Sequence, residues 1–371
     1  MVPSRVAPPP VIQGIFVSDL PVKSPFPVFD GHNDTLLKLE IDSMKGQDRS
    51  FFERSSKGHL DLERAREVGF AGGLFAMFVP SNLEQDFTKS FNPKDPANYQ
   101  QVPQKQALDF TYRLLERAET IATKSDGAAE ICLSPEANRA AIEADRMAIS
   151  LHIEGAEAID TELYALEELY KRGLRSLGLV WSRENAFGYG VPMAHPASPD
   201  IGPGLTEAGR DLVRGCNQLG ILLDVSHLNE KGFWDLARIT DRPIVASHSN
   251  AHAICPSSRN LTDKQLDAIK ESNGLVGINF HVGFLRPDGA FSSDTSLDCI
   301  ADHAAYLVDR LGEDCVALGS DFDGCLLPKD LGDVTGLGRL MEALDARGFS
   351  TQTLEKVSYL NWLAALEDAS K

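Results

Sequence analysis

Histidines and carboxylic acids end several apolar runs of this chain, and the first of these runs is the most informative. Val28 and Phe29 lead into Asp30-Gly31-His32-Asn33-Asp34-Thr35. Residues two apart in a strand point to the same side, so His32 and Asp34 would face one way. An imidazole and a carboxylate on one side make half of a metal site, although Asp-Gly and Asn-Asp are also ordinary turn sequences. Alone, the motif is a weak signal.

The same arrangement recurs along the chain. Later apolar runs end in further potential ligands, namely Glu154, His227, His248 and Asp321. A charged residue that closes a long apolar run is costly to bury without a partner. If these side chains meet, each can be another's partner through a metal, so the recurrence predicts a metal centre.

The elements that would position these residues alternate regularly. Apolar runs predict strands over 28–35, 72–80, 147–155, 174–181, 220–227, 243–248, 275–281 and 315–321. Amphipathic spacing predicts helices over 60–70, 104–124, 135–144, 163–172, 205–219, 231–239, 263–272 and 297–311. Strands apolar on both sides that alternate with helices indicate a parallel sheet covered by helices.

Eight such units favour an α/β fold of the (β/α)8 TIM-barrel type over an open doubly wound sheet. A G-x-G-x-x-G motif at a strand-to-helix turn is absent, which weakens a dinucleotide-binding alternative. We expect a Pro-rich N-terminal arm over residues 1–25 and one barrel domain over 26–371.

On a barrel, all six candidate residues would lie at the C-terminal strand ends, where barrel enzymes place their active sites. Three histidines and three carboxylates exceed the roughly four ligands of one zinc ion. They suit two ions about 3.5–4 Å apart that share a carboxylate. Glu154 lies between the two pairs of ligands and is the natural bridge, which leaves Asp321 to orient or deprotonate a water.

Composition narrows the class of partner. The chain has 371 residues, 43% hydrophobic and 24% charged, with a formal net charge of −18. This acidity argues against nucleic acid and anionic membranes, and it means that an anionic ligand needs a local positive group. Six cysteines without a C-x-x-C pair predict free, mostly buried thiols. Without a signal-peptide pattern or an apolar span of about 18 residues, we expect a cytoplasmic protein.

At these residues the chain resembles the membrane (renal) dipeptidase family of zinc peptidases, within the amidohydrolase-like barrels. The motifs that carry the resemblance are Asp30-Gly31-His32-Asn33-Asp34, Ile153-Glu154-Gly155, Asp224-Val225-Ser226-His227, Ser247-His248-Ser249-Asn250-Ala251, Ser258-Arg259-Asn260 and Gly319-Ser320-Asp321-Phe322-Asp323-Gly324. The match covers most of the chain from about Val28 onward.

The resemblance implies two Zn2+ ions per chain. His32 and Asp34 would hold one ion and His227 and His248 the other, with Glu154 bridging and Asp321 near the bridging water. It implies a homodimer that hydrolyses dipeptides, including those with a D-residue at the C-terminal position, through a metal-bridging hydroxide. Arg259 falls where the family binds the terminal carboxylate of the substrate, and guanidinium suits such bidentate binding.

Two positions depart from the family pattern. Where relatives carry a histidine proposed to bind the developing oxyanion, this chain has Trp181. Arg183 or His195 could take that role. His281 stands where relatives can carry a tyrosine near the substrate carboxylate, and it could serve the same purpose or line the pocket.

The remaining polar candidates carry weaker expectations. Asp323 could bind the free α-amino group. His152 would share the inward direction of Glu154, either as a partner of the metal ligands or as a packed core residue. His59, His252 and His303 are interpreted as structural or exposed.

Two alternatives stay open at this stage. One is another metal-dependent amidohydrolase, such as a lactone or N-acyl amino acid hydrolase. Such enzymes commonly bridge their metals with a carboxylated lysine, whereas the strands concerned here end in Glu154 and Trp181. The other is a barrel that binds metal or peptide without catalysis.

Overall fold

The parallel barrel predicted from the sequence is present. The structure is a computed structural model that describes residues 21–83, 88 and 91–371. Within these residues the barrel strands follow in the order β1 (Val28–Asn33), β2 (Phe70–Phe78), β4 (Met147–Glu154), β5 (Leu174–Gly178), β6 (Leu222–Asp224), β7 (Val245–Ala246), β8 (Leu275–Ile278) and β9 (Val316–Leu318). All neighbouring pairs are parallel.

The first and last strands meet and nearly close the barrel. The backbone N–H of Asp321 donates to His32 O at 2.9 Å, and that of Asp34 donates to Phe322 O at 2.7 Å. A parallel bridge joins Asn33 to Phe322. This closure brings the loop after β9 directly against the end of β1, which positions three of the predicted site residues together.

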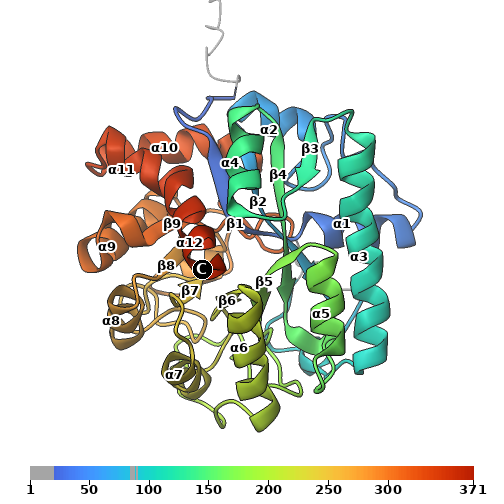
Figure 1. The fold of residues 1–371 in the computed structure, drawn as a ribbon. Helices are drawn as coiled ribbons and strands as arrows, with labels where there is room; N and C mark the ends of the chain where they lie inside the picture. The colour runs from blue at the N-terminus through green and yellow to red at the C-terminus, as the bar shows by residue number, and fades with distance from the viewer. Residues whose placement is uncertain (1–20, 84–87, 89–90) are drawn as a thin grey trace, which may run out of the picture.

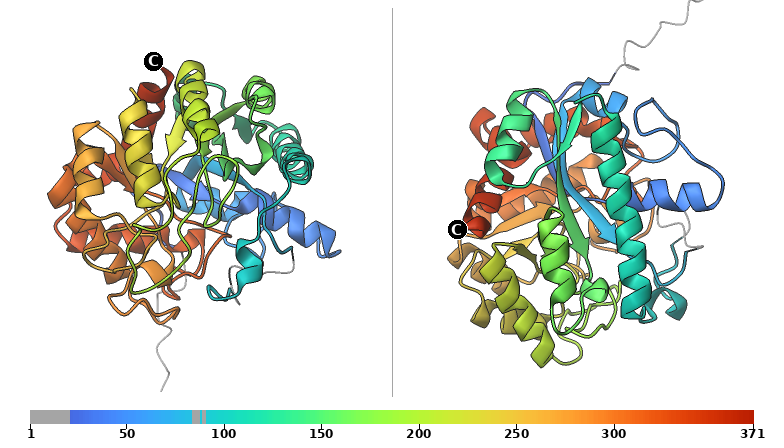
Figure 2. Two further views of the ribbon diagram at one scale, coloured as in Figure 1. Left: turned by 90° about the horizontal axis from the view of Figure 1, so that it is seen from below. Right: turned by 45° about the vertical axis from the view of Figure 1, so that its right-hand side comes forward.

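Helices surround the strands, as Figures 1 and 2 show. In chain order the longer ones are α1 (Thr35–Met44), α2 (Leu62–Val68), α3 (Gln104–Lys124), α4 (Pro135–Glu143), α5 (Tyr164–Lys171), α6 (Glu207–Leu219), α7 (Glu230–Ile239), α8 (Asp263–Glu271), α9 (Leu297–Leu311), α10 (Leu337–Ala346) and α12 (Asn361–Ser370). Between them lie the short β3 (Ala129–Ile131) and α11 (Thr351–Glu355).

The last helix closes the end of the barrel opposite the site. In Figure 1, α12 lies over the centre of the strands. Its buried Trp362 packs with Phe29 and Leu74 in one apolar cluster, and the Trp362 indole donates to Leu318 O at 2.8 Å. Gly31 makes room for this ring, because a Cβ there would lie 2.2 Å from it. The other end of the barrel is left for the functional side chains.

The structure differs from the sequence expectation in three places. The short β3 pairs with β4 outside the barrel path, and α1 fills a segment to which no element was assigned. Helix α1 buries Glu40 and Asp42 beside its leucines, so its apolar stripe is interrupted. Strands in the second half are shorter than predicted: the run 243–248 yields only Val245–Ala246, because the Ser247 N–H leaves the ladder and bonds to the Asp224 carboxylate.

Three further sequence expectations concern the cysteines, membrane-spanning helices and the N-terminal arm. The six cysteines are free thiols, four of them buried. None of the described helices combines the length and the apolar character that crossing a membrane requires. Most of the predicted N-terminal arm, residues 1–20, lies outside the described part, and 21–25 form no helix or strand.

Candidate active site

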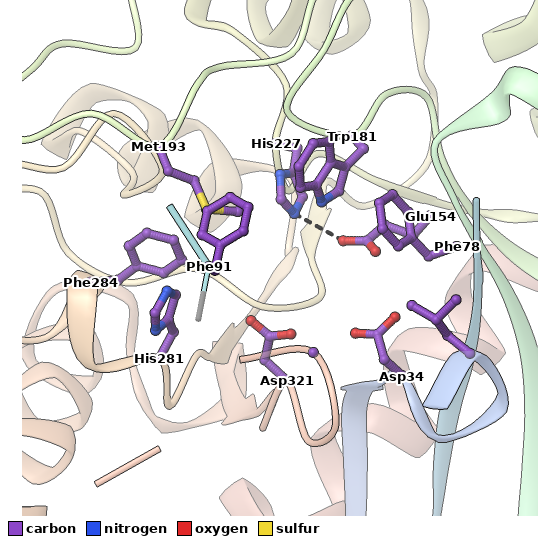
Figure 3. Close-up of a pocket in the computed structure, with 12 residues that line it drawn as sticks. Asp34, Phe78, Phe91, Glu154, Trp181, Met193, His227, His281, Phe284 and Asp321 are labelled. Atoms are coloured by element: carbon purple, nitrogen blue, oxygen red, sulfur yellow. Dashed lines mark ion pairs between the residues drawn. The ribbon is translucent and has the colours of Figure 1, made fainter. Parts of the chain in front are cut away.

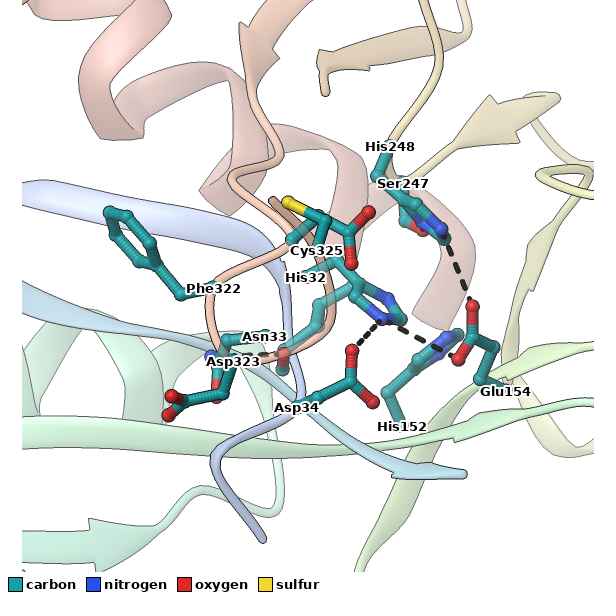
Figure 4. A network of polar contacts seen from close by, with 12 residues as sticks. His32, Asn33, Asp34, His152, Glu154, Ser247, His248, Phe322, Asp323 and Cys325 are labelled. Atoms are coloured by element: carbon teal, nitrogen blue, oxygen red, sulfur yellow. Dashed lines mark hydrogen bonds and ion pairs between the residues drawn. The ribbon is translucent and has the colours of Figure 1, made fainter. Parts of the chain in front are cut away.

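The six predicted site residues converge at the C-terminal ends of the strands (Figures 3 and 4). His32 belongs to β1, Asp34 follows it, and Glu154 ends β4. His227, His248 and Asp321 lie in the segments after β6, β7 and β9. All six are buried, and the most exposed, Asp321, is only 8% accessible.

Glu154 lies at the centre of the cluster. Its Oε1 is 2.9 Å from His227 Nε2 and 3.4 Å from His248 Nε2. Its Oε2 is 3.7 Å from His32 Nε2, which is itself 3.4 Å from Asp34 Oδ2. One carboxylate thus contacts histidines from opposite sides of the barrel, which is the arrangement that the sequence predicted for a bridge.

Side chains behind the histidines determine which ring nitrogen faces inward. The Ser247 hydroxyl donates to Asp224 Oδ2 at 2.5 Å and lies 2.7 Å from His248 Nδ1. Since a hydroxyl has one proton, Nδ1 of His248 must carry the ring proton and Nε2 offers a lone pair. Ser182 lies 2.7 Å from Nδ1 of His227 in the same manner. Such partners orient metal-ligating histidines.

The charges of the cluster are unbalanced without a cation. Burial opposes charge on His32, but the surrounding carboxylates, led by Glu154 and Asp34, outweigh it and raise the pKa of His32 to about 10. Burial raises the pKa of Glu154 well above its usual range and also raises that of Asp321. Three buried carboxylates therefore lie beside two positive groups, His32 and Arg259, and a divalent cation would balance the remaining negative charge.

The donor atoms fit metal ions. Two groups of three, His32–Glu154–His248 and His32–Asp34–Asp321, each place their ligand atoms within 4.8 Å of one another. Both ring nitrogens of His32 and Oδ1 of Asp34 are buried without a hydrogen-bond partner. Buried polar atoms are normally satisfied, so these orphaned atoms point to absent ligands. Mixed nitrogen and oxygen donors suit zinc and similar transition metals.

Strained backbone surrounds the same cluster. His227, Asp321 and Asp323 have φ values of 69°, 61° and 66°. The left-handed region costs a non-glycine residue on the order of 1–2 kcal/mol, and such strain concentrates at functional sites. Gly324 follows in the same turn. A larger residue would not fit there, because its Cβ would lie 2.0 Å from Asp34 Oδ2.

A small cavity opens onto the cluster (Figure 3). Its empty volume is about 430 Å3, including the mouth that opens to solvent, and it lies between Asp34, Glu154, His227 and Asp321 on one side and a mainly apolar wall on the other. The wall comprises Leu37, Phe78, Phe91, Trp181, Met193, His281 and Phe284. Two of the predicted substrate contacts, Trp181 and His281, therefore do line the pocket.

Arg259 lies deeper, beside the carboxylates. Its guanidinium donates to His248 O at 3.2 Å and to Ser249 Oγ at 3.5 Å, and it packs over the pocket residue Phe284 at 5.4 Å. Burial lowers the pKa of Arg259 to about 10, although Asp321 and Glu154 oppose the shift. Its Nε has no partner, so one N–H is available to a ligand.

Three other predicted residues do not reach this pocket. The Arg183 guanidinium donates hydrogen bonds to Glu157 Oε1 at 2.8 Å, Val79 O at 2.6 Å and Ser81 Oγ at 3.0 Å. It lies behind Trp181 and cannot serve as the oxyanion donor. His195 bonds Pro287 O at 3.0 Å and lines a neighbouring cavity that shares Met193 and Phe284 with the pocket. Asp323 turns away from the pocket and accepts a hydrogen bond from the His59 backbone at 2.6 Å.

His152 and Asn279 complete the surroundings of the cluster. His152 lies 2.9 Å from Ser176 Oγ and 3.6 Å from Asp224 Oδ2, with its ring 5.4 Å from that of His32. Asn279 donates to Asp321 Oδ2 at 3.0 Å. The sequence analysis missed Asn279, although its place at the end of the β8 run, beside a residue already singled out, was a usable signal.

Fold and site together define a parallel (β/α)8 barrel with a candidate metal centre at the C-terminal ends of its strands. The family model described as membrane dipeptidase, peptidase family M19, matches residues 19–371, and the chain belongs to this family. It is a metallodipeptidase. The resemblance seen in the sequence motifs is thereby confirmed.

Two solved structures agree with this assignment, and an uncharacterized curated relative is also similar in sequence. A metallopeptidase from Rhodobacter sphaeroides, liganded with a phosphinate mimic of the dipeptide L-Ala-D-Ala, is 42% identical, with a TM-score of 0.86 over 93% of this chain and 99% of that one. The dipeptidase AC of family M19 is 45% identical, with a TM-score of 0.86 over 93% of this chain and 98% of that one. An uncharacterized protein encoded in the pqqA 5′ region of Klebsiella pneumoniae is 48% identical over 70% of this chain and 96% of its own length.

Proposed function

We propose that this metallodipeptidase uses two zinc ions and that its substrates include L-Xaa-D-Xaa dipeptides. The observation that carries the proposal is the convergence of three histidines and two further carboxylates around Glu154. His32 and Asp34 would hold one ion, His227 and His248 the other, and Glu154 would bridge them. Such a pair supplies an activated water near neutral pH and polarises the scissile carbonyl.

Asp321 is the residue best placed to move protons in this reaction. Its carboxylate opens onto the pocket, and the Asn279 amide holds one oxygen at 3.0 Å. Asp321 would accept the proton of the attacking water and return it to the leaving amine. Asn279 leaves the other oxygen free for that exchange and fixes the carboxylate plane.

The substrate class follows from the size and the charge of the pocket. An empty volume of about 430 Å3, which includes the open mouth, inside an aromatic and apolar wall suits a short ligand. Arg259 is the positive group beside it and would receive the terminal carboxylate through its available N–H. The L-Ala-D-Ala mimic in the Rhodobacter sphaeroides relative supports a D-residue at the second position. Dimerisation and a cytoplasmic location stay predictions.

Hydrolysis of paired L-Ala-L-Ala and L-Ala-D-Ala by the zinc-loaded protein tests the proposal, with metal content measured on the same sample. We expect about two zinc ions per chain, cleavage of both peptides, and loss of cleavage in Asp321→Asn with the metal retained. Two metals without dipeptide cleavage, but with cleavage of a lactone or an N-acyl amino acid, would favour the other amidohydrolase class.

The role of Arg259 has a test of its own. Arg259→Met should raise the KM for L-Ala-D-Ala about 100-fold, because a buried charged hydrogen bond is lost. L-Ala-D-Ala amide lacks the carboxylate and serves as the matched substrate, whose kinetics should change little. An equal loss on both substrates would place Arg259 outside substrate binding.

A further inference from the structure

His59 lies on the far side of the turn that carries Asp321, where the sequence analysis expected no role in catalysis. The turn Ser320–Gly324 is attached to β1 on its inner side, through Asp321 N–H to His32 O and Phe322 O to Asp34 N–H. Its outer side contacts the loop 51–61 instead. Two residues of the turn, Asp321 and Asp323, have left-handed backbone and need support from both sides.

The outer support is a reciprocal pair of hydrogen bonds. The His59 backbone N–H donates to Asp323 Oδ1 at 2.6 Å, and the Asp323 backbone N–H donates to His59 Nδ1 at 2.9 Å. The His59 ring also packs edge-on against Phe322, with centroids 6.1 Å apart. This histidine therefore holds the turn at the two residues that directly follow Asp321.

A buried arginine reinforces the same contact. Arg49 Nη2 lies 3.6 Å from Asp323 Oδ2, and Arg49 Nη1 donates to Leu60 O at 3.0 Å. The Arg49 side chain is 4% exposed and that of Asp323 is fully buried. Gly58 leaves space for this pairing, since a Cβ there would lie 2.5 Å from Arg49 Nη2 and 2.9 Å from Asp323 Oδ1.

We propose that His59, through its contacts with Asp323, is a positioning residue that holds the turn bearing Asp321 in register with the pocket. The proposal rests on the proposed function, in which Asp321 moves the proton. It also explains why the Asp323 carboxylate is buried outside the pocket, where it contacts His59 and Arg49. Misplacement of a reacting group by about 1 Å can cost on the order of 100-fold in rate, so a loosened turn should lower kcat.

Two similar substitutions separate positioning from general stability. In His59→Asn the side-chain oxygen can take the place of Nδ1 and still accept from the Asp323 N–H, whereas His59→Gln places its polar atoms near the position of Nε2. On the zinc-loaded protein with L-Ala-D-Ala, we expect His59→Gln to lower kcat at least about tenfold with KM and metal content unchanged. We expect His59→Asn to stay within about threefold of the wild type.

Hydrogen exchange of the segment 319–326 gives a readout that needs no activity. We expect faster exchange in His59→Gln and in Gly58→Ala, whose added methyl would displace Arg49 and Asp323, and wild-type exchange in His59→Asn. Equal kcat and equal exchange in all variants would overturn the proposal, as would a kcat loss that follows metal loss. A wild-type protein that cleaves no dipeptide contradicts the proposed function instead, and the exchange comparison still decides whether His59 holds the turn.

Discussion

The two halves of the barrel hold their site residues by different means. In the first half, β1, β2, β4 and β5 have 6, 9, 8 and 5 residues. Strands β2 and β4 pair without interruption from Gly72 with Ala148 to Phe78 with Glu154. Backbone ladder bonds therefore lead directly to the Glu154 carboxylate, and no particular side chain is needed to place it.

The second half has little ladder to rely on. Strands β6 to β9 have 3, 2, 4 and 3 residues, and β6 and β7 pair only at Asp224 and Val245. Buried polar side chains replace the missing ladder. Asp224 accepts from the Ser226 N–H at 2.9 Å and the Ser247 N–H at 2.8 Å, and Asn250 bonds across to Asn279.

This difference predicts which site residues are most sensitive to the loss of a neighbouring hydrogen bond. Glu154 should tolerate loss of a single neighbouring hydrogen bond, because the regular β2–β4 ladder keeps its register. Ligands on the other side, His227 and His248, depend on a few buried groups whose partners cannot be replaced by water.

Glu154→Gln should have the largest effect, since Glu154 contacts histidines of both halves. Loss of the bridging charge should lower metal content and reduce kcat/KM by about 10³-fold or more, because metals supply several kcal/mol of transition-state stabilisation. Metal analysis and dipeptide kinetics check this. Full metal content with nearly normal activity would mean that Glu154 does not join the halves.

Asp224→Ala should destabilise the second half most strongly. Two backbone N–H groups and the Ser247 hydroxyl lose their buried acceptor. At about 1–3 kcal/mol per orphaned group, with partial relaxation, we expect the free energy of unfolding to fall by about 3–5 kcal/mol in urea denaturation. Asp224→Asn keeps one acceptor oxygen and should lose clearly less, and equal losses would argue against this role.

Acid should loosen the second half through His303. Its Nδ1 accepts from the Ala251 N–H at 3.1 Å and its Nε2 bonds Leu285 O at 3.0 Å, so the neutral ring links the loops after β7 and β8. Burial lowers the pKa of His303 to about 4, from an ordinary value of 6.5. Because the folded-state pKa is depressed, this stabilisation is complete above about pH 6.5 and disappears as the pH falls toward 4.

Over this pH range the contribution of His303 to the free energy of unfolding should fall by about 3 kcal/mol. This follows from roughly 1.4 kcal/mol per unit of pKa difference between the folded and unfolded states. Hydrogen exchange of residues 249–261 in the wild type should therefore accelerate between pH 6.5 and 4, after correction for intrinsic rates. His303→Asn, which cannot titrate, serves as the control and should lack the additional pH dependence. Equal acceleration in the wild type and in His303→Asn would contradict the assignment.

Ser247→Ala and Ser150→Ala form a matched pair with smaller effects. Ser247 orients His248 at 2.7 Å, so its loss should weaken zinc affinity about 10–100-fold. Ser150 on β4 bonds only Asn138 at 2.9 Å, and its loss should cost about 1 kcal/mol of stability with zinc affinity unchanged. Competition with a fluorescent zinc chelator measures both affinities, and similar values would remove the distinction between the halves.

Much of the fold and of the candidate site could be predicted from the amino-acid sequence. The apolar runs and the helices that alternate with them predicted the parallel barrel, because a strand covered on both sides needs side chains that are apolar on both faces. The ligand-bearing motifs were equally visible, since His32, Glu154 and Asp321 each break such a run. The convergence of all six residues followed from one topological fact, that parallel strands end on the same face of a barrel.

What the pattern could not decide was which polar neighbours face the pocket. Arg183, His195 and Asp323 carry suitable polar groups and follow the expected strands. Their side chains are instead hydrogen-bonded to Glu157, Pro287 and His59, respectively. Asn279, which was not singled out, reaches Asp321. Strand periodicity sets the direction of a side chain only while the strand lasts, and these residues lie beyond it, where loop backbone and long-range partners decide. The sequence therefore specified the barrel and its ligands, whereas tertiary contacts specified the residues that hold and surround them.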